Sequence, residues 1–281
     1  MVVQHNLQAM NSNRMLNVNT ASQAKSTEKL SSGYKINRAA DDAAGLAISE
    51  KMRRQVRGLT QASANAEDGI SCVQTAEGAL NEVHDMLQRI NELAVKGENA
   101  TLTTLDRQYI GSEVNQLMSE IDRVKSTTTF NEQSLLDGTF TGKGLQVGAE
   151  SNQHINISIG TIAVSTLFAG DTKGLKFYTA SNLSSLQASD FQKLNAGCKE
   201  AIKSIATKRS DLGAVQNRLE HTINNLDNVV ENTTAAESAI RDTDMATEMV
   251  KFANNNILAQ AGQAMLAQAN QANQGVLSLL G

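Results

Sequence analysis

The absence of proline is the sequence feature that most constrains the fold of this chain. None of its 281 residues is Pro. Proline removes a backbone N–H and clashes with the preceding turn, so it commonly ends or kinks a helix. A chain without proline can therefore form helices much longer than the globular average of about 11–12 residues. Because aromatic residues make up 3% and apolar residues 40% of the chain, we expect a core of aliphatic side chains on long helices.

Composition also limits the possible partners. The formal net charge is −4 and the isoelectric point is near 5.6, so the chain lacks the basic field that binds nucleic acid. No stretch approaches the ~20 consecutive apolar residues of a membrane span. The N-terminus also lacks the apolar segment of a cleaved secretory signal. We therefore expect no nucleic-acid partner and no membrane insertion, with the chain either cytosolic or exported by a route that reads no cleaved signal.

Helical periodicity organises the first half of the chain. In residues 1–40 a helix with a thin apolar stripe runs from Val3 to Leu30, Gly33 supplies its C-terminal cap, and a linker follows. In residues 41–125 the acidic pair at 41–42 caps a helix that runs to about Lys96. A second helix covers 105–124, and apolar residues in both recur at steps of three and four. We interpret 1–40 as half of a terminal coiled coil and 41–125 as the N-terminal helices of a core bundle.

The pattern changes in the middle of the chain and then returns. Residues 126–189 are rich in Thr, Ser, Gly and Asn, and their short period-two alternations predict a β-hairpin turnaround. Residues 190–240 form the C-terminal helix of the core bundle, antiparallel to the first long helix. Residues 241–281 open with a carboxylate-rich cap and form the second half of the terminal coiled coil. The predicted fold is mainly α, a long antiparallel helical bundle or coiled coil with a small β-hairpin region in the middle.

The two terminal helices carry too little apolar surface to be stable alone in water. Asn and Gln interrupt the stripe of the last helix at several positions. We expect both helices to fold against each other first and then against neighbouring copies of the chain. The positions predicted to make these assembly contacts are Val3, Leu7, Met10, Met249, Phe252, Leu266, Leu277 and Leu280.

No arrangement of residues typical of an enzyme occurs in the sequence. The four histidines lie far apart, and neither a zinc-protease motif nor a nucleophile elbow occurs. The Gly138–Gly144 stretch is one residue too short for a phosphate loop, so it reads as an ordinary turn. The sequence therefore predicts no catalytic residue, no cofactor and no metal site.

The two cysteines are expected to behave as small buried hydrophobic residues. In the antiparallel pairing of the long helices, Cys72 faces a position near Asp211. That position is about 20 Å from the level of Cys198 at 1.5 Å per residue. We predict no disulfide within the chain.

Several segments resemble a known family. The stretch 28–52, EKLSSGYKINRAADDAAGLAISEKM, is similar to the N-terminal signature of bacterial flagellins, and 58–70, GLTQASANAEDGI, continues it. Similar matches follow at 77–96, at 115–124 and at the C-terminal 267–281, AQANQANQGVLSLLG. Only about 126–189 matches weakly. The short middle leaves no room for outer domains, so the resemblance implies a minimal, core-only flagellin.

The resemblance implies a structural subunit of the bacterial flagellar filament, which serves motility. Such a chain is secreted and extracellular, and it polymerises with other copies of itself through its terminal helices. It leaves the cell unfolded through the flagellar type III exporter, held until then by a flagellar export chaperone. Filament cap and junction proteins are further implied partners.

The resemblance also implies recognition by innate immunity. Arg89 on the first long helix and Glu113 on the second match residues that flagellins present to Toll-like receptor 5, together with Leu93, which we expect to be half-exposed. Without the resemblance this patch reads as a packing surface between subunits. The C-terminal Leu277, Leu279 and Leu280 resemble the part of flagellins read by inflammasome sensors of the NAIP type.

Two alternatives share parts of the pattern. A hook–filament junction protein has the same terminal coiled-coil signals, and abundance in sheared filaments discriminates it from a filament subunit. A secreted helical adhesin or effector predicts no polymerisation. The unbroken DDAAGLAI motif at 41–48 and the LSLL ending favour the filament subunit.

Overall fold

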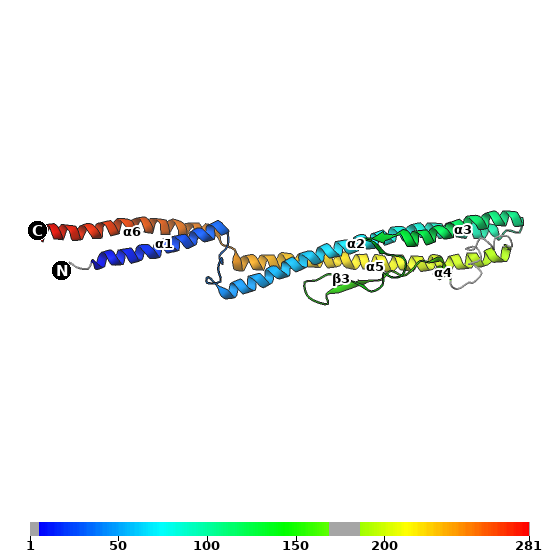
Figure 1. The fold of residues 1–281 in the computed structure, drawn as a ribbon, viewed down its shortest axis with the longest axis horizontal. Helices are drawn as coiled ribbons and strands as arrows, with labels where there is room; N and C mark the ends of the chain where they lie inside the picture. Colours follow the sequence, from blue (N-terminus) through cyan, green and yellow to red (C-terminus); the bar gives the residue numbers. More distant parts are fainter. Residues whose placement is uncertain (1–5, 169–185, 281) are drawn as a thin grey trace. The chain divides into compact units, whose positions relative to one another are not determined.

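The computed structural model describes residues 6–168 and 186–280, with side chains up to Gln271. It is mainly helical: α1 covers Leu7–Ser32, α2 Ala43–Gly97, α3 Thr104–Thr127, α4 Val164–Leu167, α5 Ala188–Arg241 and α6 Met245–Leu280 (Figure 1). The chain divides into two compact units, unit 1 formed by 1–56 with 231–281 and unit 2 by 57–230. The prediction of a mainly α fold is confirmed.

The ends of the helices follow from local sequence. Gly33 adopts φ 77°, a left-handed conformation that costs other residues energy, and its N–H donates to the Lys29 carbonyl at 2.8 Å. The Asp42 carboxylate accepts from the Gly45 N–H at 2.9 Å, so it caps α2 as predicted. Asp244 caps α6 in the same way, accepting from the backbone N–H of Ala246 at 3.0 Å.

Unit 2 contains an aliphatic three-helix core. Within it, α2 and α5 run side by side and α3 lies along α2 (Figure 1). The buried stripe of α2 recurs at steps of three and four, and its fully buried members are Ala66, Val73, Ala76, Leu80, Val83, Leu87, Ile90 and Ala94. Close approach at one end depends on Gly97, because a Cβ there would collide with the ring of Phe191 on α5. The stripe predicted for this helix is confirmed from Val73 to Ala94, whereas Ile48, which was predicted to belong to it, is 48% exposed.

The antiparallel register of α2 and α5 differs from the predicted one by about one turn. Glu77 pairs with Arg209 at 3.5 Å, and a Cβ at Gly69 would lie 3.4 Å from Leu219. These contacts place Cys72 level with about residue 215, rather than with Asp211. The prediction misjudged the register because it was counted from the ends of both helices, which periodicity locates only to within a turn.

Both cysteines are buried and free. Burial raises the pKa of the Cys72 thiol, and it raises that of Cys198 to about 12. The two thiols are therefore packing groups of the unit 2 core, as the sequence indicated.

Two small antiparallel hairpins follow α3. In the first, β1 (Thr129–Phe130) pairs with β2 (Gln133–Ser134), and in the second, β3 (Lys143–Gln146) pairs with β4 (His154–Ile157). Between them, Gly138 (φ 94°) and Gly142 (φ 64°) adopt positive φ angles in an irregular connection that leads into β3. The short helix α4, which lies within the stretch predicted as β-hairpin, was not anticipated.

Within the described residues, no helix is both long enough and apolar enough to cross a membrane. The long helices of this chain alternate apolar and polar faces instead, as bundle helices do.

The first hairpin carries backbone strain at its turn. Asn131 (φ 48°) and Glu132 (φ 64°) both adopt left-handed conformations. This turn type favours Asn followed by Gly, because a Cβ at the second position is strained. We expect Glu132→Gly to raise the free energy of unfolding by about 0.5–1 kcal/mol, measured by urea denaturation of the monomer. Glu132→Ala, which keeps the strained Cβ, should give no such gain, and equal gains from both variants would contradict the assignment.

Candidate functional site

The terminal helices α1 and α6 pair antiparallel in unit 1 (Figure 1). At one end the Asn6 side chain donates to the Ala269 carbonyl at 3.0 Å. In the middle Leu16 packs against Gly262, where a Cβ would lie 3.4 Å from the Leu16 side chain. At the other end the Ser26 hydroxyl donates to Glu248 at 2.7 Å. The pairing predicted between the two ends of the chain is confirmed within the described residues.

The seam between these helices is poor in apolar surface. On α6 the buried apolar side chains of the described stretch are alanines, Ala259 and Ala269. On α1 the half-buried and buried positions recur at steps of three and four, and most are small or polar: Ala9, Ser12, Leu16, Asn19, Gln23, Ser26 and Leu30. Small side chains let the two backbones approach, but they bury little apolar area.

Large apolar side chains cover the outer faces of the pair instead. Those classed as exposed on α1 and α6 are Leu7, Met10, Met15, Val18, Met245, Met249, Val250, Ile257, Leu258 and Met265. Leu7 and Met10 are 70% and 64% exposed. The stripe predicted to pack first against the other terminal helix included Leu7, Met10 and Met249, and for these three residues the expectation is wrong, because they are exposed in the pair.

The other predicted assembly positions vary in exposure. Met249 is 54% exposed, whereas Phe252 and Leu266 are half-buried. Val3 lies outside the described residues. Leu277, Leu279 and Leu280 lie at the end of α6, in the part whose side chains are not described.

A buried carboxylate forms the polar centre of the seam. Glu248 is 6% exposed, accepts from Ser26, and pairs with Lys251 at 3.5 Å. The hydrogen bond from Ser26, together with the nearby Lys29 and Lys251 ammonium groups, lowers the pKa of Glu248 below its ordinary value of 4.5. Sequence reasoning missed this residue, because a Glu in the first turn of a helix usually faces solvent.

A second polar cluster joins the two linkers of unit 1. The Lys35 N–H donates to the Arg241 carbonyl at 2.6 Å. The Arg241 guanidinium lies 4.6 Å from the centre of the Tyr34 ring and 3.1 Å from Glu50. Lys25 pairs with Asp41 at 2.9 Å, which with backbone hydrogen bonds lowers the pKa of Asp41 to about 2. Arg241 thus links both linkers to the first turns of α2.

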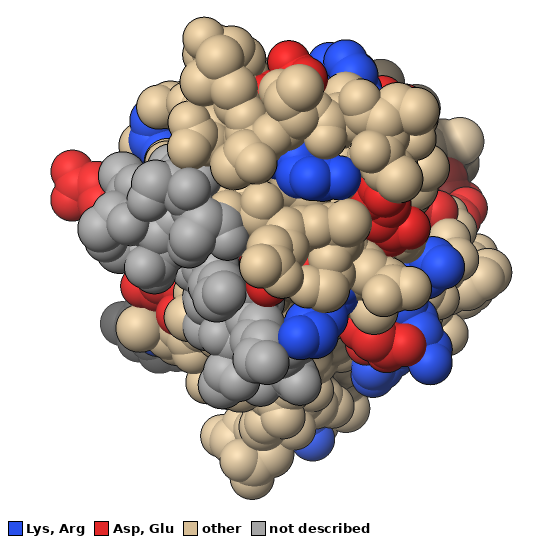
Figure 2. Space-filling view, turned by 90° about the vertical axis from the view of Figure 1, so that its right-hand side faces the viewer, with Lys and Arg blue, Asp and Glu red and all other residues tan. Residues whose placement is uncertain are grey.

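On unit 2 the structure brings Arg89 and Glu113 together. The Arg89 guanidinium on α2 bonds Glu113 on α3 at 2.8 Å and Glu92 at 3.0 Å. The side chains of Arg89 and Glu113 are 51% and 47% exposed. An exposed ion pair of this kind adds little stability to the fold. At the end of the molecule where α3 begins, acidic and basic side chains are interspersed on the described surface (Figure 2).

Leu93 does not belong to this exposed surface. It is 3% exposed and forms part of the unit 2 core, so the expectation of a half-exposed Leu93 is wrong. The single-helix projection placed Leu93 at the flank of the stripe. Arg89, one turn before Leu93, bonds Glu113 on α3, so this flank of α2 lies toward α3 rather than toward solvent.

The described residues offer no metal-type cluster. No group of three or more His, Cys, Asp or Glu side chains converges in this part of the chain. His84, His154 and His221 lie on three different elements, α2, β4 and α5, and His5 lies outside the described residues.

Comparison with known proteins assigns the chain to a family. The model of the bacterial flagellin N-terminal helical region matches residues 3–141, and that of the C-terminal helical region matches 196–280. Flagellin of Halalkalibacterium halodurans is 52% identical over the full length of both chains. The chain belongs to the flagellin family. Flagellin of Bacillus subtilis is 47% identical, again over both full lengths.

One solved structure supports the fold alone. A putative flagellar hook-associated protein from Vibrio parahaemolyticus is 12% identical and aligns with a TM-score of 0.60, over 72% of this chain and all of that one. As a flagellin, the chain is a structural subunit of the flagellar filament, which is extracellular, and it polymerises with further copies of itself.

The buried carboxylate makes the stability of the α1–α6 pair depend on pH. Because the folded-state pKa of Glu248 is lowered from 4.5, its contribution is present above that value and is lost as the pH falls through the folded-state pKa. We expect Glu248→Gln to lower the melting temperature of the terminal helices at pH 7 and to weaken its decline between pH 5 and pH 3. Circular dichroism melts measure both effects. Glu231→Gln, an exposed position on α5, is the matched control, and identical pH profiles for the two variants would disprove the role of Glu248.

Proposed function

We propose that the outward faces of α1 and α6 drive polymerisation of this flagellin. The observation that carries the proposal is the inverted distribution of side chains in the terminal pair. Its seam holds mostly small and polar groups beside a few larger ones such as Leu16, whereas large apolar side chains such as Leu7, Met10 and Ile257 are exposed. Exposed apolar surface of this extent marks an interaction site. Neighbouring copies in the filament cover it.

The same exposed apolar surface would be covered by a chaperone before the chain assembles. We infer that the chain crosses the flagellar type III exporter unfolded, and that an export chaperone binds the amphipathic C-terminal segment until then. Exposed residues of α6 such as Met249 and Leu258 are the apolar surface such a chaperone would cover. Filament cap and junction proteins are the partners at the two ends of the polymer.

The alternatives predict different behaviour. A hook–filament junction protein occurs only at the base of a filament, and a helical adhesin does not polymerise. Full-length similarity to two flagellins at 52% and 47% identity favours the filament subunit. Seeding purified chain with short filament fragments tests this by negative-stain microscopy, with a truncated chain lacking residues 243–281 as control. Filament growth by the full chain but not by the truncated chain supports the proposal. If neither chain forms filaments, the proposal is overturned.

The contribution of the apolar side chains of α6 to assembly can be measured at Leu266. Leu266 is half-buried in the monomer, and we expect the polymer to bury it fully. Leu266→Ala should then weaken each subunit contact by about 2 kcal/mol, near the lower end for a buried Leu, and raise the critical concentration for assembly about 30-fold. Leu266→Met conserves the volume and should assemble almost normally. An unchanged critical concentration for Leu266→Ala would rule out this position.

We further propose that the Arg89 surface contacts Toll-like receptor 5. An exposed Arg held in place by Glu113 on a neighbouring helix has the character of an interface anchor. Since Leu93 is buried, its contribution is to support α2 beneath Arg89 rather than to contact the receptor. The C-terminal Leu277, Leu279 and Leu280 are likewise proposed to contact inflammasome sensors of the NAIP type.

The receptor proposal has a matched control within α3. Arg123 is 60% exposed and pairs with Glu120, as Arg89 pairs with Glu113. We expect Arg89→Ala to lower receptor signalling by the monomer about tenfold or more, the equivalent of a single interface anchor, and Arg123→Ala to leave it unchanged. Equal signalling by the two variants would contradict the proposal. Leu93→Ala is unsuitable as a test, because emptying a buried site costs about 2–5 kcal/mol of folding stability.

A further inference from the structure

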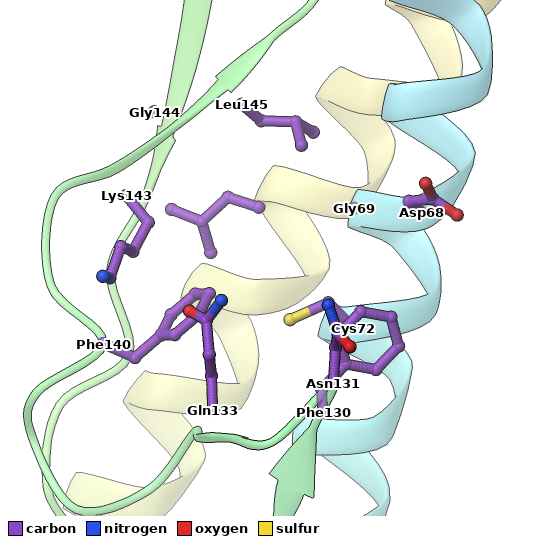
Figure 3. A pocket seen from close by; sticks show the side chains of 11 residues that line it. Asp68, Gly69, Cys72, Phe130, Asn131, Gln133, Phe140, Lys143, Gly144 and Leu145 are labelled. Carbon is purple, nitrogen blue, oxygen red and sulfur yellow. The ribbon is translucent and has the colours of Figure 1, made fainter.

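An open apolar pocket lies between α2 and the two hairpins of unit 2 (Figure 3). Its volume is about 170 Å³. The rings of Phe130 and Phe140 and the aliphatic Leu145 and Ile157 line it, and the sulfur of Cys72 points into it from α2. An apolar cavity of about 150 Å³ accepts one benzene ring. The pocket therefore has room for one aromatic side chain.

The rim of this pocket is polar and its floor is apolar. Asp68, Gln133 and Lys143 are exposed at the opening. The floor owes its shape to Gly69, since a Cβ there would collide with Leu145. Pockets with an apolar floor and a polar rim are typical of sites that receive an anchor residue from a protein partner.

The same chain exposes an aromatic anchor. Tyr109 on α3 is 66% exposed, which makes it the most exposed aromatic residue in the described part of a chain with few aromatics. Tyr34 is held beneath Arg241, and the described phenylalanines are at least half-buried. Exposing a large ring to water is unfavourable, and tyrosines inserted into pockets dominate the energetics of many interfaces.

The ring cannot reach the pocket of its own chain. Tyr109 lies one turn before Glu113, which bonds Arg89 on α2. The pocket begins at Cys72, 17 residues before Arg89 on the same helix. At 1.5 Å per residue, with the further turn to Tyr109, the ring and the pocket lie about 30 Å apart along unit 2. An anchor and a pocket at different places on one chain make a head-to-tail contact, which generates a filament when its rotation does not close into a ring.

We propose that Tyr109 of one copy inserts its ring into the Phe130–Phe140–Cys72 pocket of a second copy in the filament. The two copies are then offset by about 30 Å along α2. The inference rests on the proposed polymerisation and adds a contact in unit 2 to those of the terminal helices. The ring supplies the anchor, so phenylalanine can replace tyrosine but alanine cannot.

Site-specific photo-crosslinking in the polymer tests the contact. Full-length chain carrying Tyr109→p-benzoylphenylalanine is copolymerised with excess unmodified chain, irradiated, and digested for mass spectrometry. Crosslinks between copies to peptides that contain 68–72, 130–133 or 140–145 support the proposal. Crosslinks confined to other peptides, or to the pocket of the same copy, overturn it, as does a filament that yields none.

Variants at exposed positions provide a second readout with little risk to folding. Tyr109→Ala removes the anchor, and Gln133→Trp covers the opening of the pocket. We expect each variant to raise the critical concentration for assembly about tenfold, which is the effect of one interface anchor. Tyr109→Phe should assemble normally. Val95→Ala, another exposed apolar position of unit 2, is the matched control. Equal effects of Tyr109→Ala and Val95→Ala overturn the proposal, provided that circular dichroism melts show all variants folded.

Filament growth and the Tyr109 contact can be tested separately. If unmodified chain forms no filaments on seeds, the proposed function fails. If it forms filaments and Tyr109 crosslinks elsewhere, only the unit 2 contact is wrong.

Discussion

The polar seam between α1 and α6 is the constraint on which the behaviour of this flagellin depends. A helix pair joined mainly by alanines, amides and one buried carboxylate, with its few large apolar side chains only half-buried, buries too little apolar area to be strongly stable by itself. The large apolar side chains that a globular protein buries in its core are here exposed on the outer faces of the pair. Stability of the termini is therefore tied to the concentration of other subunits, as in any oligomer whose partners bind only the folded form.

Unit 2 shows the opposite distribution. Its aliphatic side chains are buried along α2, α3 and α5. Because Gly97 has no Cβ, the ring of Phe191 can pack directly against α2. The core of unit 2 belongs to the monomer, whereas the apolar faces of the termini belong to the assembly. The Arg241 cluster lies in unit 1, where it holds both linkers by one cation–π contact and one ion pair.

Sequence reasoning recovered the features that depend on local chemistry. The caps at Gly33, Asp42 and Asp244 and the buried stripe of α2 follow from side chains close in sequence, so periodicity and capping rules suffice. Features set by a third partner were not recoverable. Leu93 is buried on the flank of α2 that lies toward α3. A helical projection of α2 alone contains no information about the position of α3.

The candidate sites divide in the same way. The meeting of Arg89 with Glu113 was implied by resemblance, but the face by which α1 meets α6 was misjudged because apolar residues were assumed to face inward. That rule describes monomers. Glu248, Arg241 and the Cys72 pocket gave no distinctive local pattern, since each is assembled from residues that are distant in sequence.

The burial of the two thiols has a consequence for the chemistry of the chain outside the cell. Oxidants and disulfides react with the thiolate, and a pKa raised to about 12 at Cys198 leaves very little thiolate at neutral pH. The folded core therefore shields Cys198 from oxidative crosslinking, whereas the sulfur of Cys72 lines an open pocket. An unfolded copy of the same chain exposes the Cys198 sulfur at its ordinary reactivity, so folding is also the step that protects this thiol from oxidation.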